Sequence, residues 1–226
     1  MITKEEYFKR QVLLWGKETQ EQLSSKSIAI IGCGGLGSTL AISLGSSGIG
    51  SVYLVDFDTV SVHNIHRQIA YTIEDEGEYK CEALGKLLKR RYAELNVFTY
   101  KEKFETFIAQ EHKFDLIIDA TDRFPVRASI DKYAKRQGIP WVHGSVEAFH
   151  GYVCFYDKAS FDSFEITDQV PGGITPPIVV FIASLQANLA LRYLAGLTVG
   201  KDELHYLYFD EFGSFNHRKF LLREGD

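Results

Sequence analysis

A glycine-rich turn, GCGGLG, follows the short apolar run SIAII and contains Gly32, Gly34, Gly35 and Gly37. The pattern Gly-x-Gly-x-x-Gly between a strand and a helix is typical of phosphate binding, because an anion can then approach the backbone and the first helical amides. Asp56 ends the next apolar run, 19 residues after Gly37, where such a unit binds a ribose hydroxyl. These residues predict a nucleotide site without identifying the nucleotide. The alternative is that the glycines serve only helix–strand packing and that Asp56 is merely an exposed strand end.

Asp58 lies two residues beyond Asp56 and would face the same side if the strand continued, because side chains alternate along a strand. Two carboxylates at that point cannot both approach phosphate favourably. Asp58 is therefore interpreted as a cap or as a partner for Arg67 or Lys80 in preference to a second ribose ligand. It still belongs to the candidate nucleotide-binding residues.

Further polar and cationic side chains lie in the stretch VHNIHRQIAY and at the start of the next helical pattern, namely Asn64, Arg67 and Lys80. A dinucleotide dehydrogenase has little use for them, because its pyrophosphate is already bound by the glycine turn and the helix amides. Extra cations matter where a triphosphate must be neutralised or pyrophosphate must leave. The simpler alternative is that Arg67 and Lys80 pair with neighbouring acids on a solvated face, which is common for a single Lys or Arg.

The stretch DATDRFPVR adds Asp119 and Asp122 at the end of another apolar run. In open α/β sheets ligands bind beyond the carboxyl ends of the strands, so Asp122 is expected to face the same crevice as the glycine turn. A carboxylate there can bind Mg²⁺ on phosphate oxygens. The alternative, which does not exclude the first, is that Asp122 caps the helix that follows, ahead of Pro125.

The elements that must position these residues alternate between strand and helix in the first part of the chain. The run SIAII, the glycine turn, a helix over STLAISLGSSG and the strand SVYLVD form a strand–helix–strand unit with parallel strands. A helix is predicted over residues 79–95, a strand over VFTYKEKF, a strand over FDLIIDATD, a helix over 126–137 closed by Gly138, and a strand over PWVHGSVEA.

The pattern changes toward the C-terminus. GYVCFYD, LHYLYFDEF and SFNHRKFLL alternate as antiparallel strands do. The sequence therefore predicts an α/β, Rossmann-like nucleotide-binding fold with a mixed sheet, parallel in its first half and antiparallel in its C-terminal strands, and with helices on both faces. We expect one domain over residues 1–226, with a long functional loop at about 157–176.

Composition narrows the class of partner. A net charge of −5 does not favour nucleic acid, and the long apolar run from Pro176 to Leu197 is interrupted by polar residues, so we expect neither a nucleic-acid nor a membrane partner. The N-terminus has no apolar segment of the secretory type, which predicts a cytoplasmic protein. Three scattered cysteines predict reduced thiols without a disulfide framework. Cys81 is singled out, because a helix start beside Lys80 would lower the pKa of its thiol. None of the histidines is assigned a catalytic role.

Taken in order, these motifs resemble the ThiF/MoeB/HesA family of adenylyltransferases, which are relatives of the ubiquitin-activating enzymes. The resemblance rests on YFKRQVLLWG, GCGGLG, DFDTVSVHNIHRQ, Lys80, DATD and ASLQANLALRYLAG, and it runs from Tyr7 to about Leu222. It implies ATP-dependent activation of a C-terminal glycine carboxylate on a small ubiquitin-like sulfur-carrier protein ending in Gly-Gly. The product would be an acyl adenylate, with release of pyrophosphate, in thiamine or molybdopterin biosynthesis.

The same resemblance assigns roles to residues. Gly35 would lie against the nucleotide and Asp56 would bind its ribose. Phosphates would be contacted by Asn64, Arg67 and Lys80, and Mg²⁺ by Asp122. Arg10 would reach across a homodimer into the partner's ATP site. Arg123 stands where many relatives have Asn, and would either add a phosphate contact or point to solvent.

This chain departs from the family in two ways. Many relatives bind zinc through two CxxC pairs, which are absent here, so no zinc is expected and either the metal is dispensable or something else holds the late loop. Some relatives also have a cysteine on the loop before the late helix. That loop reads FEITDQVPGGITPP here, so a thioester or persulfide step on it is not expected.

Three alternatives remain beside the carrier-protein adenylyltransferase. One is a family member that activates a small carboxylate, a peptide or a modified tRNA base. Another is a non-catalytic subunit that pairs with a catalytic sister. The missing zinc ligands and loop cysteine would suit it, and it is opposed by the presence of Asp56, Arg67, Lys80 and Asp122. The third, a nicotinamide dehydrogenase, is supported by the glycine turn and Asp56 alone.

Overall fold

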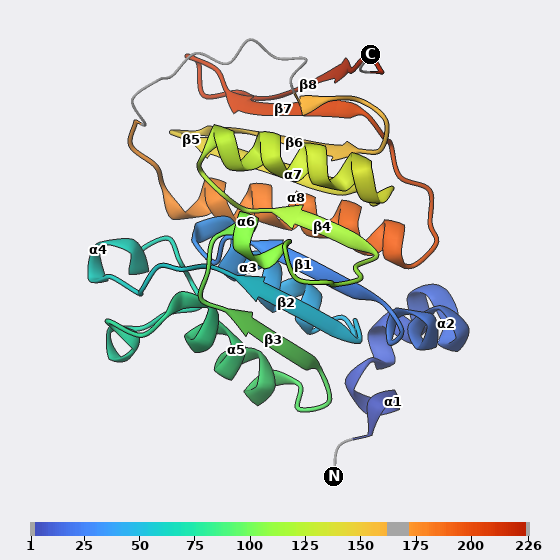
Figure 1. Cartoon of the computed structure of the whole chain (residues 1–226). Helices are drawn as coiled ribbons and strands as arrows, with labels where there is room; N and C mark the ends of the chain where they lie inside the picture. Colours follow the sequence, from blue (N-terminus) through green and yellow to red (C-terminus); the bar gives the residue numbers. More distant parts are fainter. Residues whose placement is uncertain (1–2, 162–171, 225–226) are drawn as a thin grey trace.

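The computed structural model describes residues 3–161 and 172–224, and its strands form an eight-stranded sheet in the order β3-β2-β1-β4-β5-β6-β7-β8 (Figure 1). The strands are Ser27–Ile31 (β1), Ser51–Val55 (β2), Asn96–Tyr100 (β3), Leu116–Asp119 (β4), Trp141–Glu147 (β5), His150–Tyr156 (β6), Glu203–Phe209 (β7) and Phe215–Leu221 (β8).

The sheet is parallel from β3 across to β5 and antiparallel from β6 to β8. The predicted mixed sheet is thereby confirmed. The inner parallel strands are buried on both faces and read as continuous apolar runs, such as SIAII in β1, whereas β8 at the edge is largely exposed. The carboxyl ends of β1, β2 and β4 lie side by side, which brings the predicted site segments together.

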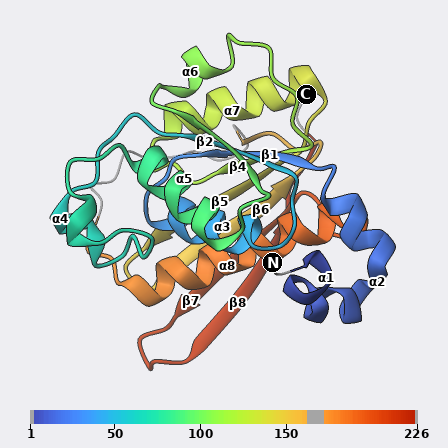
Figure 2. The same ribbon diagram turned by 90° about the horizontal axis from the view of Figure 1, so that it is seen from below.

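Helices cover both faces, as expected. They are Lys4–Tyr7 (α1), Lys9–Leu23 (α2), Gly35–Gly45 (α3), Val62–Ile65 (α4), Lys80–Arg91 (α5), Phe104–Phe107 (α6), Phe124–Gln137 (α7) and Pro176–Leu194 (α8), with a 3-10 turn over Ile73–Asp75. One core cluster joins α3, α5 and α8 to the sheet, and a second joins α6 and α7 to the opposite face. Figure 2 shows α7 and α8 on opposite sides of the sheet.

Helix boundaries differ from the sequence-based prediction by a few residues. The helix predicted over residues 79–95 ends at Arg91, because Tyr92 is extended and the chain must turn before it enters β3. The N-terminal helical segment is divided into α1 and α2, and α2 is kinked at Gly16, whose φ is +85°. Gly138 closes α7 in the left-handed conformation, as predicted.

α8 is long and apolar enough to cross a membrane by length and composition. In this fold it is a core helix, because Ile178, Ile182, Ala183 and Ala190 are buried against the sheet and α3. Of the polar residues that interrupt its apolar run, Ser184 is partly buried, Asn188 and Arg192 are exposed, and Gln186 is buried.

The segment that follows β6 is held by one aspartate. Oδ1 of Asp202 accepts hydrogen bonds from the backbone N–H groups of Asp157, Lys158 and Ala159, at 2.9, 3.2 and 3.1 Å. Asp202 itself has φ +57°, and its carbonyl accepts from the N–H of Leu222 at 2.8 Å. Through its carboxylate and its backbone carbonyl, Asp202 therefore links residues 157–159 to the end of β8. Half of the functional loop predicted at about 157–176, namely residues 162–171, lies outside the described residues.

Candidate active site

The glycine turn at the end of β1 is shaped by close packing at three of its glycines. Gly32 has φ +91°, and a β-carbon there would lie 2.7 Å from the carbonyl oxygen of Ala120. A β-carbon on Gly37 would lie 1.9 Å from the carbonyl oxygen of Gly32, and one on Gly35 would lie 2.8 Å from Val179. Close packing alone therefore explains why Gly32, Gly35 and Gly37 have no side chain, as the alternative interpretation of the glycine turn proposed. It also shows that the end of β4 lies directly against the turn.

Gly34 is different, since packing does not explain its missing side chain. A β-carbon there would have only the amide nitrogen of Gln68 as a neighbour, at an ordinary 3.6 Å. Gly34 is the N-cap of α3 and makes no side-chain cap. The first amides of a helix have no acceptor within the helix and favour an anion. The amino end of α3 is thus suited to bind phosphate.

Asp56 follows β2 and braces the turn. Its Oδ2 accepts from the N–H of Cys33 at 2.6 Å and its Oδ1 from the N–H of Asp58 at 2.8 Å. Burial raises the pKa of Asp56, while these two hydrogen bonds act in the opposite direction. Carboxylate oxygens accept more than one hydrogen bond each, so a ribose hydroxyl can still be bound. Asp56 both fixes the glycine turn and remains a ribose ligand candidate.

Asp58 and Lys80 form an ion pair, with 3.2 Å between Nζ of Lys80 and Oδ2 of Asp58. The structure confirms the interpretation of Asp58 as a partner of Lys80. The Lys80 side chain is 8% exposed, whereas that of Asp58 is 55% exposed. The positive charge of Lys80 also lowers the pKa of Asp56 against the effect of burial, so the ammonium group faces the same site.

The stretch from Asn64 to Arg67 lies on the other side of the glycine turn. Arg67 donates from Nη2 to Oδ1 of Asn64 at 3.2 Å. A β-carbon on Gly35 would lie 3.5 Å from the carbonyl oxygen of Arg67 and 3.8 Å from its Cγ. The structure therefore brings Asn64 and Arg67 to the amino end of α3, as the sequence predicted.

Asp122 is exposed in the turn between β4 and α7. The alternative role as helix cap is wrong, because Arg123 occupies the N-cap position of α7 and no side chain caps that helix. Arg123 is also exposed. Since Ala120 contacts Gly32, the Asp122 turn lies beside the glycine turn. We refer to Gly34, Asp56, Arg67, Lys80 and Asp122 together as the carboxyl-end site.

Tyr71 was missed by the sequence-based reasoning. Its hydroxyl lies 2.7 Å from the carbonyl oxygen of Cys33 and 3.2 Å from that of Lys80, and the side chain is 4% exposed. Tyr71 therefore connects the glycine turn, the start of α5 and the stretch that carries Arg67. A tyrosine in a loop gives no sequence signal for such a link.

A buried polar cluster beside the site was also missed as a unit. Asp119 is fully buried at the end of β4 and contacts His143 from β5 and Arg127 from α7. Gln186 of α8 donates to the carbonyl oxygen of Asp119 at 2.9 Å. Only the three-dimensional pairing of β4, β5 and α7 reveals this cluster.

Arg10 is the one predicted site residue that the single chain leaves far away. It is exposed on α2, which packs at the carboxyl end of α3 through a hydrogen bond from Gln11 to the carbonyl of Ser47. The glycine turn is at the other end of α3, about 16 Å away along a helix of 11 residues. Figures 1 and 2 accordingly show α2 and α4 at opposite sides of the molecule.

The interpretation of Cys81 as a thiol with a lowered pKa is wrong. Cys81 is fully buried, and burial raises the pKa of its thiol to about 11, with the charge of Asp56 acting in the same direction. The thiol pKa values of Cys33 and Cys154 are raised by burial as well. All three cysteines therefore act as small core residues.

Within residues 3–161 and 172–224, no group of three or more His, Cys, Asp or Glu side chains is placed to bind a metal ion. Mg²⁺ does not require such a group, because it commonly binds through one or two carboxylates together with substrate phosphates and water. Asp122, exposed beside the phosphate-binding end of α3, fits that mode.

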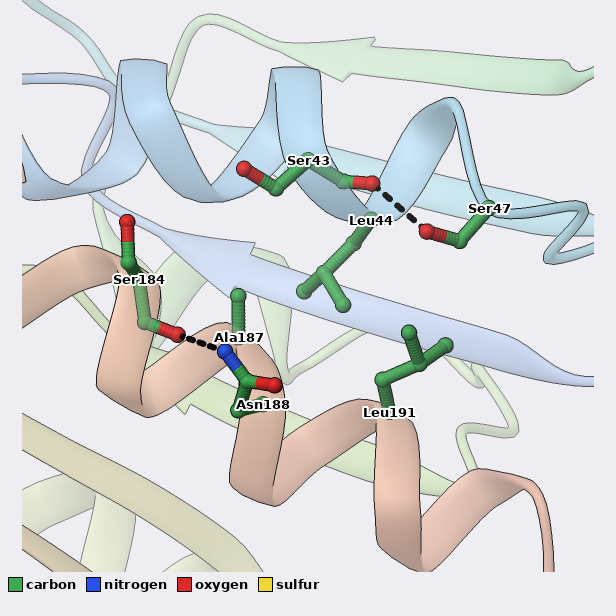
Figure 3. Close-up of a pocket in the computed structure, with 7 residues that line it drawn as sticks. All are labelled: Ser43, Leu44, Ser47, Ser184, Ala187, Asn188 and Leu191. Carbon is green, nitrogen blue, oxygen red and sulfur yellow. Dashed lines mark hydrogen bonds between the residues drawn. The ribbon is translucent and has the colours of Figure 1, made fainter. Parts of the chain in front are cut away.

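A surface hollow of about 160 Å³ lies between α3 and α8, away from the carboxyl-end site (Figure 3). Two of its polar side chains bind backbone carbonyls four residues earlier in the chain, since Ser47 donates to the carbonyl of Ser43 and Asn188 to that of Ser184, both at 2.8 Å. None of the predicted site residues lines this hollow, so it is not the nucleotide site.

Comparison with known proteins gives one consistent family. The model of the ThiF family matches residues 8–223. The sulfur carrier protein adenylyltransferase of Thermus thermophilus is 31% identical, over 98% of this chain and 89% of the relative. The adenylyltransferase and sulfurtransferase MOCS3 of Dictyostelium discoideum is 32% identical over 79% of this chain, but the match spans only 45% of that longer protein.

Solved structures agree on the fold. The crystal structure of Escherichia coli MccB with ATP superposes with a TM-score of 0.88, covering 99% of this chain and 72% of that chain, at 18% identity. At that identity the likeness establishes the fold alone.

Proposed function

From the premise that this chain belongs to the ThiF family, whose curated relatives are adenylyltransferases, we propose that it adenylates the C-terminal glycine carboxylate of a small ubiquitin-like sulfur-carrier protein. ATP is the second substrate, Mg²⁺ the metal, and pyrophosphate the leaving group. The chain spans about half the length of the MOCS3-type relative but most of the Thermus relative, so the adenylation step is the part of their chemistry that we assign to it.

The observation that carries the proposal is the set of charges around the uncapped amino end of α3. Arg67 lies against Gly35 on one side, Lys80 lies beside Asp56 on another, and the Asp122 turn adjoins Gly32. Cations on two sides of a phosphate-binding helix end suit a triphosphate better than a dinucleotide.

These residues act mainly by binding and orientation. The incoming carboxylate is already ionised at neutral pH, since its pKa is about 3.5, so no general base is needed. One of its oxygens forms a bond to the α-phosphorus while the bond to the bridging α–β oxygen breaks, and that oxygen leaves with pyrophosphate. Attack of an anion on an anion is slow unless charge is screened, which Arg67, Lys80 and the α3 amides would do. Mg²⁺ on Asp122 would neutralise charge on the phosphate oxygens.

A homodimer is part of the proposal. Arg10 cannot approach its own carboxyl-end site without leaving the far end of α3. Leu13 and Leu14, three and four residues beyond Arg10 on α2, are 73% and 74% exposed. Residues at these spacings share a helix face, so Arg10 stands beside an apolar pair that a second copy can cover. That arrangement would place Arg10 in the partner's site.

The carrier would dock along the antiparallel half of the sheet. Tyr152, Tyr206 and Tyr208 stack across β6 and β7 with ring centroids 4.6 and 4.7 Å apart, and Arg218 lies 5.5 Å from the Tyr208 ring. These partly exposed aromatic side chains offer a contact surface of the kind that is enriched at protein interfaces.

The test is ATP–pyrophosphate exchange with purified protein, Mg²⁺ and a carrier that ends in Gly-Gly. Exchange that requires the carrier is expected, and the matched control is the same carrier with its terminal carboxylate converted to an amide, which has no nucleophilic oxygen. Exchange with small carboxylates but not with several carriers would contradict the carrier assignment. ATP binding without exchange in any of these mixtures would favour a partner-dependent subunit.

A further inference from the structure

The geometry points to the buried cluster of Asp119, Arg127 and His143 as a set of positioning residues that hold Asp122 for Mg²⁺ bound to the nucleotide. This inference rests on the proposed function, in which Asp122 is the carboxylate ligand of that metal. It concerns the residues behind the site and assigns them no contact with the nucleotide.

The first step is that the backbone just before Asp122 is fixed from both sides. Oδ1 of Asp119 accepts from the N–H of Thr121 at 2.9 Å and from its hydroxyl at 2.7 Å. Nη2 of Arg127 donates to the carbonyl oxygen of Thr121 at 2.6 Å. Both polar groups of the Thr121 backbone are thus bound to charged side chains, and such hydrogen bonds are stronger than neutral ones.

The second step is that Asp119 and Arg127 are themselves held in place. Oδ2 of Asp119 lies 2.9 Å from Nδ1 of His143 and 3.3 Å from Nε of Arg127. Burial lowers the pKa of His143, so the ring is neutral near pH 7 and donates its proton to the carboxylate. Gln186 binds the Asp119 carbonyl from α8. The cluster is therefore anchored in β4, β5, α7 and α8 at once.

The third step is that Asp122 depends on this support. Among the described residues its carboxylate makes no hydrogen bond or ion pair, and its side chain is exposed. A metal ligand must be held to within about 0.5 Å of its working position. Since no described residue binds the carboxylate itself, its position is set by the Thr121 backbone and by the start of α7.

A purely stabilising role is a weaker explanation for these charges. Asp119 is 0% and Arg127 4% exposed, and taking two charges out of water costs more than apolar residues of the same size would. An ion pair in such a place is better explained by the geometry that it imposes on Thr121. We therefore expect its loss to affect metal-linked nucleotide binding beyond any effect on folding.

The experiment measures the Kd of a non-hydrolysable ATP analogue for each variant, once with Mg²⁺ and once with EDTA. Each variant is first shown by its Tm to be folded at the temperature of the measurement. Wild type should bind more tightly with Mg²⁺, and Asp122→Asn should lose that enhancement. In Arg127→Lys the enhancement of binding by Mg²⁺ should be about tenfold smaller than in wild type, since partners behind a metal ligand typically contribute 10–100-fold to metal affinity. The EDTA value should stay nearly unchanged.

His143→Phe is the second variant, because it keeps an aromatic ring beside Trp141, Tyr156 and Phe161 but removes the donor to Asp119. His143→Phe should also show a smaller enhancement of binding by Mg²⁺. If Arg127→Lys fails to fold, His143→Phe alone tests whether the buried cluster positions Asp122. The matched control is Asp131→Asn. Asp131 is 2% exposed on the same helix, but it binds Trp141 and Ser160 and has no contact with Thr121. Its Mg²⁺ enhancement should equal that of wild type.

A double-mutant cycle makes the test specific. If Arg127 acts through Asp122, Arg127→Lys should cause no further loss in the Asp122→Asn background. The inference is overturned if folded Arg127→Lys and His143→Phe keep the full Mg²⁺ enhancement that Asp122→Asn loses, or if their losses are the same in EDTA. Wild-type protein that binds no ATP analogue would refute the proposed function and the inference with it. Full enhancement in Asp122→Asn would refute only the metal role of Asp122 and what rests on it.

Discussion

At the scale of single residues, Asp122 is the exposed carboxylate that is proposed to bind Mg²⁺ in the reaction. We expect Asp122→Ala to lower carrier-dependent ATP–pyrophosphate exchange at least ~100-fold, the loss typical when one preorganised electrostatic group is removed. Because the exposed Asp122 carboxylate makes no hydrogen bond or ion pair with the described residues, the Tm should be nearly unchanged. The control is Glu111→Ala, an exposed acid outside the site. An Asp122→Ala protein with wild-type exchange would show that the metal is bound elsewhere.

His143 gives the protein a pH dependence of stability with a definite sign. Burial lowers the pKa of His143 below its usual 6.5, against the effect of the hydrogen bond that the ring donates to Asp119. The unfolded chain then binds more protons than the folded one as the pH falls through 6.5, so folded stability is lost on the acidic side. Charged or titratable groups that face the ring are Asp119 from β4, Arg127 from α7 and Tyr156 from β6.

The measurement is urea unfolding of wild type and His143→Gln between pH 7.5 and 5.5. In wild type, burial raises the pKa of Asp119, but the hydrogen bond from His143 and the charge of Arg127 lower it by more, so Asp119 is ionised over this range. In the variant the Arg127 charge and the Thr121 hydrogen bonds remain. The stability of the variant relative to wild type should rise as the pH falls, by up to about 1.4 kcal/mol per pH unit. A difference that does not change with pH would mean that the ring titrates alike in both states.

At the scale of elements, Asp202 holds the start of the loop that follows β6, for which the sequence analysis identified no supporting residue. Its carboxylate accepts three backbone N–H bonds from residues 157–159, and its left-handed φ of +57° suits Asp and Asn better than Ala. Asp202→Ala should destabilise the protein by ~1–3 kcal/mol, because three backbone N–H groups lose a charged acceptor and alanine is strained at a left-handed φ. Asp202→Asn keeps an acceptor and the favoured conformation, so it should lose less. Equal losses in urea unfolding would contradict this account.

The parts of the fold that the sequence predicted are those where local pattern and tertiary role agree. SIAII is apolar throughout because both faces of β1 are covered, and Gly138 ends α7 because a left-handed residue is needed there. Element boundaries were less accurate, since the end of α5 at Arg91 depends on how the chain enters β3.

The site residues likewise fall into those that the sequence predicted and those that it missed. Gly34, Asp56, Arg67 and Lys80 were predicted from residue type and spacing, and the proximity of Arg67 to Gly35 agrees with their predicted grouping. Tyr71 and His143 were missed because their roles are hydrogen bonds to residues 38 and 24 positions away. The thiol of Cys81 was misjudged because burial outweighs the helix end, and burial is not visible in a motif.

At the scale of the whole molecule, the decisive feature is that Arg10 and the carboxyl-end site lie at opposite ends of α3. If two copies complete each other's sites, a dimer has two composite sites, each with Asp122 from one chain and Arg10 from the other. Arg10→Ala alone and Asp122→Ala alone should then be inactive. Leu13→Asp should prevent the dimer from forming, because it places a charge in the apolar contact, and analytical ultracentrifugation would show a monomer.

Mixing the two inactive variants distinguishes action between chains from action within one. A heterodimer of Arg10→Ala and Asp122→Ala has one intact composite site and one doubly damaged site. Random exchange of subunits puts half of the chains into heterodimers, so exchange activity should recover to about a quarter of wild type. Recovery should vanish when both variants also carry Leu13→Asp, since it requires association. Activity that merely equals the sum of the separate variants, with dimers present, would mean that Arg10 serves its own chain or only supports α2.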